Sequence, residues 1–260
     1  MQRQPGDGLI VWYDLMSTDP AATDAFYAGV FGWQIDTESV MPTGYRPWNQ
    51  QGQPFGGVLP WDAALGSGSW MPYVQISELD RLVDLTEDLG GTVHVEPTEI
   101  SEIGRYAAVS DPTGAPLCLF ELPPDRRALA TMYNRGEGFP IWNELITTGL
   151  DAATRFYRAL IGWKLVPISP GPPPYTVAKT GSVAAAGLYQ PANPPAHSMW
   201  IVSFQTSDID GAIARVQQFG GKVIHPVNDA PGIGRTAWVA DPTGAVFGLM
   251  QPETGWLDRL

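Results

Sequence analysis

The chain repeats itself at a constant spacing of 130 residues, and this repeat constrains its fold more than any other feature. FYAGVFGW at 26–33 is matched by FYRALIGW at 156–163, and the DPTGA turn at 111–115 recurs at 241–245. Further landmarks, a double glycine and an Ile-Gly-Arg step among them, keep the same offset without a gap. A long internal repeat of this kind indicates that one structural unit occurs twice in the chain.

Two copies of one domain are therefore predicted, the first at 8–122 and the second at 138–252. The charged, irregular segment 123–137 is predicted to be the linker between them. Each copy is itself predicted to consist of two similar halves, because the order strand, helix and three short strands occurs twice within it. The predicted fold is thus α+β, built from four βαβββ modules at 8–61, 69–122, 138–190 and 198–252.

The first module carries clear helix signals. Asp19 stands where an N-cap is needed, Pro20 follows at the first helical position, and Gly32 stands where the helix should end. The preceding stretch, LIVWYDLMS at 9–17, alternates as a half-buried strand does. The helix is therefore expected to pack on one face of a sheet that begins with this strand.

Composition excludes several classes of function. The formal net charge is −12, so a phosphate backbone or an anionic membrane surface would be repelled, and neither nucleic acid nor membrane is an expected partner. Hydrophobic residues make up 44% of the chain, enough for a packed core, but no apolar run is long enough to cross a bilayer. A single cysteine, Cys118, gives no internal disulfide. A cytoplasmic protein is expected.

The order of these motifs resembles the vicinal oxygen chelate superfamily, which includes glyoxalase I, bleomycin resistance proteins and extradiol dioxygenases. The resemblance rests on the FYAGVFGW and FYRALIGW helices, the double glycines, and the DPTGA turns ahead of an apolar strand. It implies half-open barrels of mixed strands around a cavity. It also implies an intramolecular pseudo-dimer of the two copies, present as a monomer or a homodimer, with a small molecule as partner.

The resemblance further implies where a divalent metal would be held, on the first strand of each half and on the last strand. Those positions carry residues that are poor ligands for a hard metal, namely Trp12, Met71 and Cys118 in the first copy and Trp142, Ile201 and Gly248 in the second. No metal and no cofactor is therefore expected.

Strand alternation predicts which side chains face each cavity. Trp12 and Asp14 share a face of the first strand, and Trp142 and Glu144 are their equivalents. Asp14 and Glu144 are candidate general bases, or else structural acceptors of hydrogen bonds from a neighbouring Trp or Arg such as Arg105 or Arg235. The predicted ligand-binding residues are Trp12, Met71, Tyr73, Gln75, Cys118, Trp142, Ser203 and Gln205.

The function predicted from these features is metal-free binding of an apolar or aromatic small molecule, for detoxification or sequestration. An enzyme of the same superfamily is the alternative, either a glyoxalase-type lyase acting on methylglyoxal adducts or a hydroxylase or dioxygenase-like enzyme. A third reading keeps one pocket and gives the other copy a structural role only.

The DPTGA turns themselves are predicted to connect strands. Asp and Pro begin the turn and Gly supplies a positive φ. We expect Asp111 and Asp241 to accept hydrogen bonds from backbone donors and not to take part in chemistry.

Overall fold

The computed structural model describes residues 4–36, 43–65, 68–128, 136–169 and 174–260. It confirms the predicted α+β fold of four βαβββ modules. The first copy contains β1 (Ile10–Ser17), α1 (Pro20–Phe31), β2 (Gln34–Ile35), β3 (Arg46–Gln50), β4 (Gln53–Pro60), β5 (Ser69–Ile76), α2 (Leu79–Asp88), β6 (Thr92–Ile100), β7 (Gly104–Ser110) and β8 (Pro116–Glu121).

The second copy repeats the same order of elements. It contains β9 (Pro140–Ile146), α3 (Leu150–Leu160), β10 (Lys164–Pro167), β11 (Thr176–Thr180), β12 (Val183–Tyr189), β13 (Met199–Gln205), α4 (Ile209–Gln218), β14 (Lys222–Ala230), β15 (Gly234–Ala240) and β16 (Val246–Pro252). Three short 3-10 helices complete the chain, η1 (Ala63–Leu65), η2 (Pro124–Arg126) and η3 (Trp256–Arg259). Residues 129–135 of the predicted linker lie outside the described residues.

The helix signals of the first module are confirmed. The Asp19 side chain accepts a hydrogen bond from the backbone N–H of Ala22 over 3.0 Å, and Pro20 opens the helix. Gly32 closes it in the left-handed conformation with a φ of 76°. The capping pattern read from the sequence therefore fixes both ends of α1.

The strands form two mixed sheets with the same internal order. Among the described residues, one sheet runs β2-β3-β4-β1-β5-β8-β7-β6 and the other β10-β11-β12-β9-β13-β16-β15-β14. The first strand of each copy pairs in parallel with the fourth, and this register places Asp14 opposite Gly57 and Glu144 opposite Gly187. The repeat in sequence is thus also a repeat in register.

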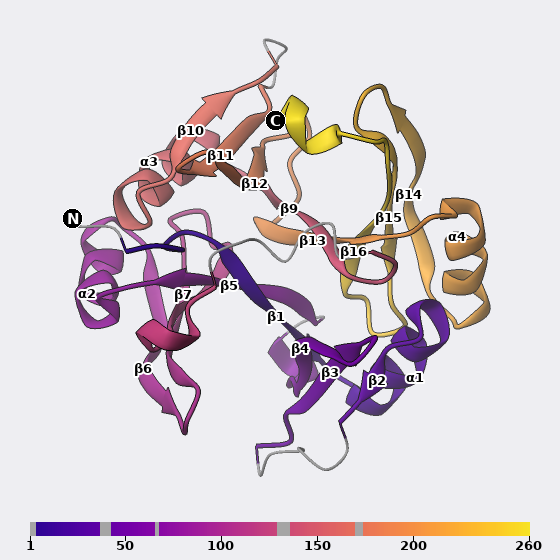
Figure 1. Cartoon of the computed structure of the whole chain (residues 1–260), viewed down its shortest axis with the longest axis horizontal. Helices are drawn as coiled ribbons and strands as arrows, with labels where there is room; N and C mark the ends of the chain where they lie inside the picture. Colours follow the sequence, from indigo (N-terminus) through magenta and orange to yellow (C-terminus); the bar gives the residue numbers. More distant parts are fainter. Residues whose placement is uncertain (1–3, 37–42, 66–67, 129–135, 170–173) are drawn as a thin grey trace. The chain divides into compact units, whose positions relative to one another are not determined.

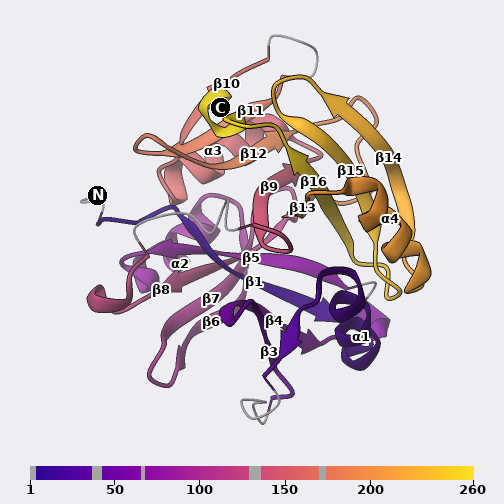
Figure 2. The same ribbon diagram turned by 45° about the vertical axis from the view of Figure 1, so that its right-hand side comes forward.

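The chain divides into two compact units, and each unit draws on both copies. Unit 1 consists of Met1–Val11, Pro72–Thr131 and Asn143–Trp200, and unit 2 consists of Trp12–Met71, Met132–Trp142 and Ile201–Leu260. Within unit 1, α2 lies beside α3, and within unit 2, α1 lies beside α4 (Figures 1 and 2). The division into domains at 8–122 and 138–252 stays a prediction.

The tryptophan that ends each FGW or IGW motif forms a hydrogen bond with the start of the other copy. In unit 2 the indole Nε1 of Trp33 donates to the backbone oxygen of Gly138 over 2.9 Å. In unit 1 the indole Nε1 of Trp163 donates to that of Gly8 over 2.8 Å. Both bonds are buried, so this repeated landmark has a structural role.

The DPTGA turns connect strands, as predicted. One carboxylate oxygen of Asp111 accepts from the backbone N–H of Thr113 (2.8 Å) and Ala115 (3.1 Å) and from the Thr113 hydroxyl (2.7 Å). Asp241 makes the equivalent three bonds at 2.8, 3.0 and 2.8 Å. Both aspartates are buried, and each holds its turn closed.

Each turn also meets a tyrosine of the other copy's helix motif. In unit 2 the pKa of Tyr27 is raised well above its ordinary value, first by burial and then by the charge of Asp241, while the Trp70 indole opposes the shift. In unit 1 Tyr157, Asp111 and Trp200 repeat this arrangement. The two strongest sequence landmarks, the FY pair and the DPTGA turn, therefore face each other in the packed units.

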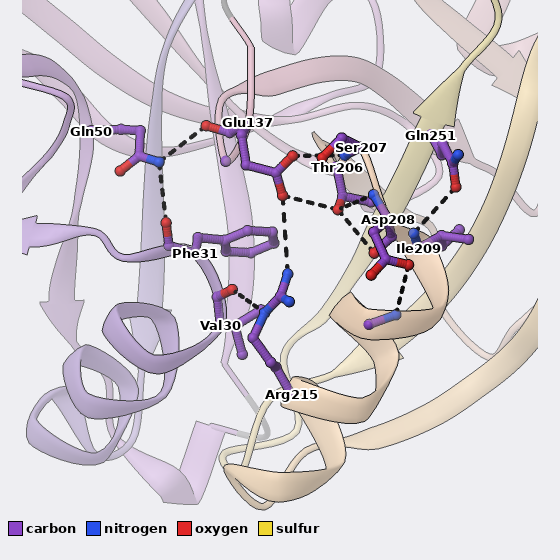
Figure 3. A network of polar contacts seen from close by, with 12 residues as sticks. Val30, Phe31, Gln50, Glu137, Thr206, Ser207, Asp208, Ile209, Arg215 and Gln251 are labelled. Atoms are coloured by element: carbon purple, nitrogen blue, oxygen red, sulfur yellow. Dashed lines mark hydrogen bonds and ion pairs between the residues drawn. The ribbon is translucent and has the colours of Figure 1, made fainter.

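A polar network around Glu137 holds the end of the predicted linker in place within unit 2. Figure 3 shows the Glu137 carboxylate accepting from the Thr206 hydroxyl (2.9 Å) and the backbone N–H of Ser207 (2.6 Å). The Gln50 amide donates to the backbone oxygens of Glu137 (3.0 Å) and Phe31 (3.1 Å). Residues from the first and fourth modules are thus joined through Glu137, the last residue of the predicted linker.

Replacing Glu137 by alanine is expected to lower the free energy of unfolding by about 1–2 kcal/mol, because it removes two hydrogen bonds at a partly exposed site. The ion pair with Arg215, at 4.0 Å and half-exposed, should add little. Urea denaturation of Glu137→Ala measures the loss, with the exposed Glu253→Ala as control. Equal stability of the two variants would show that the network does not hold unit 2 together.

In the described part of the chain, no helix is both long and apolar enough to cross a membrane.

Candidate functional site

In the first copy, two donors converge on one carboxylate oxygen. The Tyr45 hydroxyl donates to Oδ1 of Asp14 over 2.9 Å. The Trp12 indole Nε1 lies 3.0 Å from the same oxygen and 2.9 Å from the Tyr45 hydroxyl oxygen. Asp14 is 3% exposed, and a buried carboxylate is costly unless donors satisfy it. These three residues of unit 2 therefore form one hydrogen-bonded cluster, the Asp14 site.

A glycine on the neighbouring strand gives the tyrosine its path to the carboxylate. Gly57 is the register partner of Asp14, and a Cβ at Gly57 would lie 2.5 Å from the Tyr45 hydroxyl oxygen. In the second copy Gly187 is the partner of Glu144, and a Cβ there would lie 2.0 Å from the Tyr175 hydroxyl. Neither position leaves room for a larger side chain while the tyrosine stays in place.

The second copy places Glu144 and Tyr175 in the equivalent arrangement, the Glu144 site of unit 1. Burial raises the pKa of Glu144 above its ordinary value, and a hydrogen bond from Tyr175 opposes the shift. Glu144 nevertheless remains only half-buried, unlike Asp14. A carboxyl group whose pKa is raised by burial is a candidate for a functional role.

The tyrosine acts as a fixed donor in the first copy. The pKa of Tyr45 is raised well above its ordinary value by burial and by the charge of Asp14, while the Trp12 indole opposes the shift. Tyr45 therefore keeps its proton at neutral pH, and its hydroxyl hydrogen points at the carboxylate.

Replacing Glu144 by glutamine should change the pH dependence of stability. The pKa of Glu144 is raised in the folded state, so between its ordinary value of 4.5 and the folded value the folded chain binds more protons than the unfolded chain. Stability is therefore lost as pH rises through this window. Glu144→Gln lacks this loss and should be at least as stable as the wild type at neutral pH.

Urea denaturation below and well above the ordinary pKa of glutamate measures this difference, with Glu253→Gln as an exposed control. A wild type that becomes increasingly more stable than Glu144→Gln as pH rises would contradict the expectation, because the ionised carboxylate would then be stabilising.

The tyrosines of both sites were not found by sequence reasoning. The signal was present, since Tyr45 and Tyr175 share the offset of the repeat, as do Gly57 and Gly187. The expectation that Arg105 and Arg235 hold the carboxylates is wrong. Their guanidinium groups pair instead with Asp80 and Asp210, at 2.7 and 2.8 Å.

The predicted binding residues of unit 1 lie on neighbouring strands. Tyr73 is the register partner of Cys118, and its ring lies 5.6 Å from that of Phe120. Gln75 is fully buried, and its amide both donates to the oxygen of Ala128 (3.0 Å) and accepts from its N–H (2.8 Å). A ligand would have to displace this backbone contact to reach Gln75.

In unit 2, Ser203 and Gly248 are register partners, and the Ser203 hydroxyl occupies the space that a side chain at 248 would need. The Gln205 side-chain oxygen is buried and accepts no hydrogen bond from the residues that the structure describes. The ring of Trp142 packs edge to face on Trp256 at 5.6 Å. Ligand contact by these residues stays a prediction.

The residues at the family's metal positions do not fit a hard divalent metal. Trp12 uses its indole nitrogen as a donor, Cys118 is buried on β8, and Gly248 brings no side chain. Within the described ranges, no three His, Cys, Asp or Glu side chains are placed to hold an ion together. These side chains therefore do not form a site for metal-dependent chemistry.

A groove of unit 1 lies away from Glu144. It has a volume of about 660 Å³, with the β6–β7 turn at Ile100–Gly104 and the η2 helix along its sides. None of the predicted site residues lines it. The predicted site residues and this groove are thus separate features.

Comparison with known sequences finds one matching family model and several relatives. The model described as "Glyoxalase/Bleomycin resistance protein/Dioxygenase superfamily" matches residues 142–249. A protein of Mycobacterium tuberculosis named "Putative glyoxylase CFP32" is 33% identical over 93% of this chain and 94% of its own length. The anthracycline biosynthesis protein DnrV of Streptomyces peucetius is 30% identical, over 96% and 95% of the two chains.

Solved structures share the fold at low identity. The Mn(II)-bound glyoxalase from Novosphingobium aromaticivorans superimposes with a TM-score of 0.65 at 16% identity, covering 96% of this chain and 83% of that one. At this identity the match shows the fold and not the reaction.

Proposed function

Because the chain belongs to the glyoxalase/bleomycin resistance protein/dioxygenase superfamily, we propose that it binds a small aromatic molecule without a resident metal. The observation that carries this proposal is the carboxylate–tyrosine pair, whose carboxylate comes from β1 in the first copy and from β9 in the second. Trp12 lies beside the first pair, and the ring of Tyr189 lies 6.3 Å from that of Tyr175 in the second. Aromatic side chains of this kind suit a flat apolar ligand, and the carboxylate gives such a ligand a polar anchor.

Two further observations support this reading. The positions where a metalloenzyme of the family would hold its ion carry Trp, Cys and Gly, so ligand binding has to rest on the chain's own groups. One relative of this chain is named for anthracycline biosynthesis, and an anthracycline is a fused aromatic molecule. Sequestration or detoxification of such a compound, by domains at 8–122 and 138–252 that form an intramolecular pseudo-dimer, is the role we propose.

An enzyme is the second candidate, and the raised pKa of Glu144 favours it. A general base works best when its pKa lies near the working pH, and burial moves Glu144 in that direction. The relatives named as glyoxylases make a lyase acting on a methylglyoxal adduct the first reaction to test, ahead of a hydroxylase or dioxygenase-like reaction. In such a lyase Glu144, or Asp14, would take a proton from carbon next to a carbonyl.

Titration with alizarin, a dihydroxylated anthraquinone, tests the binding proposal. Alizarin is expected to quench tryptophan fluorescence of the wild type in a saturable way. Trp142→Ala should weaken the affinity at least tenfold, or about 1.4 kcal/mol, because an aromatic wall is lost. Unsaturable quenching, equal in Trp142→Ala and wild type, would refute binding at this residue.

The enzyme reading is tested by turnover of the hemithioacetal of methylglyoxal. Turnover that disappears in Glu144→Gln but persists in Glu253→Gln would establish the lyase in place of the binding protein. Turnover unaffected by either change would exclude Glu144 as the base.

A further inference from the structure

We infer that Gly57 and Gly187 are positioning residues of the Asp14 and Glu144 sites, because each leaves the space through which a tyrosine reaches its carboxylate. The inference rests on the proposed function, in which the carboxylate–tyrosine pair anchors the ligand. It adds a third residue to each pair, and this residue decides where the tyrosine hydroxyl lies.

The two copies have diverged strongly in the segment that carries these residues. Between 43–60 and 173–190, the offset of the repeat brings identical residues together at two positions. These positions are Tyr45 with Tyr175, and Gly57 with Gly187. Even the residue before the glycine differs, since Gly56 corresponds to Ala186. Both copies therefore keep the tyrosine and the glycine while the rest of the segment changes around them.

The tyrosine has to cross a strand to reach the carboxylate. In the sheet order, β4 lies between β3 and β1, and β12 lies between β11 and β9. Tyr45 directly precedes β3, and Tyr175 directly precedes β11. Asp14 and Glu144 lie on β1 and β9, two strand spacings or roughly 10 Å away. The ring must therefore pass over the middle strand.

The glycine of the middle strand stands where the ring passes. A Cβ at Gly187 would lie 2.0 Å from the Tyr175 hydroxyl oxygen and 2.5 Å from Cζ of the same ring. A Cβ at Gly57 would lie 2.5 Å from the Tyr45 hydroxyl oxygen and 2.8 Å from the backbone oxygen of Arg46. These distances are far below van der Waals contact, so an alanine would have to displace the tyrosine.

Backbone conformation does not call for glycine at either position. Neither Gly57 nor Gly187 has a positive φ, so alanine could adopt the same backbone. Glycine inside a strand also costs stability relative to alanine. The space left for the ring is thus the reason that the structure offers for a glycine here in both copies.

Fluorine-19 NMR of the protein labelled with 3-fluorotyrosine tests this inference. The signals of Tyr45 and Tyr175 are assigned by their loss in Tyr45→Phe and Tyr175→Phe. Gly187→Ala is expected to shift the Tyr175 signal and to leave that of Tyr45 in place. Gly57→Ala should do the reverse, so each variant is the control for the other. A Tyr175 signal that stays in place in Gly187→Ala, folded by circular dichroism, would overturn the inference.

Urea denaturation gives a second test that needs no label. Gly187→Ala should lower the midpoint of the wild type but not that of Tyr175→Ala, in which the ring is gone. If Gly187→Ala alone does not fold, folding should return in the Tyr175→Ala background. An equal fall of the midpoint in both backgrounds would show that the alanine does not act through Tyr175, and would overturn the inference.

Alizarin binding separates this inference from the proposed function on which it rests. If the pair anchors the ligand, Gly187→Ala and Tyr175→Phe should each weaken alizarin binding about tenfold in calorimetric titration. A shifted Tyr175 signal with unchanged alizarin affinity in both variants would refute the proposed function and leave the positioning role of Gly187 standing. The two failures are therefore distinguishable.

Discussion

Replacing Trp33 by alanine is expected to lower the free energy of unfolding by about 3–5 kcal/mol, the range for a buried large aromatic side chain. The ring is 3% exposed and stacks on Tyr27 at 4.8 Å. It also contacts Phe55 at 4.7 Å and Phe204 at 4.9 Å, so its removal leaves a cavity among aromatic rings. The substitution further removes the buried hydrogen bond to Gly138.

Urea denaturation followed by far-ultraviolet circular dichroism measures this loss. Ile224→Ala, at the most exposed of the large apolar residues in the described part of the chain, is the control and should cost about 0.5 kcal/mol or less. Trp163→Ala is the matched variant in unit 1 and should behave as Trp33→Ala does, because its indole makes the equivalent bond to Gly8. A loss of unfolding free energy below about 1 kcal/mol in both tryptophan variants would contradict the view that these indoles hold the two copies together.

Asp241→Ala is expected to cost about 2–4 kcal/mol, whereas Asp241→Asn should be nearly neutral. Alanine removes the acceptor of three hydrogen bonds and leaves the buried N–H of Ala245 without a partner. Asparagine keeps an oxygen in the same place. Because it is neutral, it also avoids the cost of burying a charge, the effect that raises the pKa of Asp241. Its amide also removes the negative charge that acts on Tyr27.

The same denaturation experiment measures both variants, with Asp111→Ala and Asp111→Asn as the equivalent pair in unit 1. Asparagine as costly as alanine would mean that the charge of Asp241, and not its acceptor geometry, stabilises the turn.

Most of the fold could be predicted because the repeat makes each local signal appear twice. The Asp19 cap, the Pro20 start and the Gly32 end depend on neighbours in sequence, and all three are confirmed. The DPTGA turns were predicted correctly for the same reason, since the three hydrogen bonds by which Asp241 closes its turn all lie within four residues.

What could not be predicted depends on distant contacts. Spacing alone does not reveal that Trp33 bonds to Gly138, or that each compact unit combines modules of both copies. At the candidate site the carboxylates were identified from strand alternation, but their tyrosine partners were not. Tyr45 reaches Asp14 across another strand, at the one place where Gly57 leaves room, and no local pattern records such a path.

The proposed function requires that the chain bind its aromatic ligand with its own side chains and without a metal. Calorimetric titration with alizarin, before and after treatment with a strong chelator and dialysis, tests this requirement. The same affinity and stoichiometry are expected in both preparations, with no change when Mn²⁺ is added back. Binding that is lost on chelation and restored by one equivalent of Mn²⁺ would contradict it.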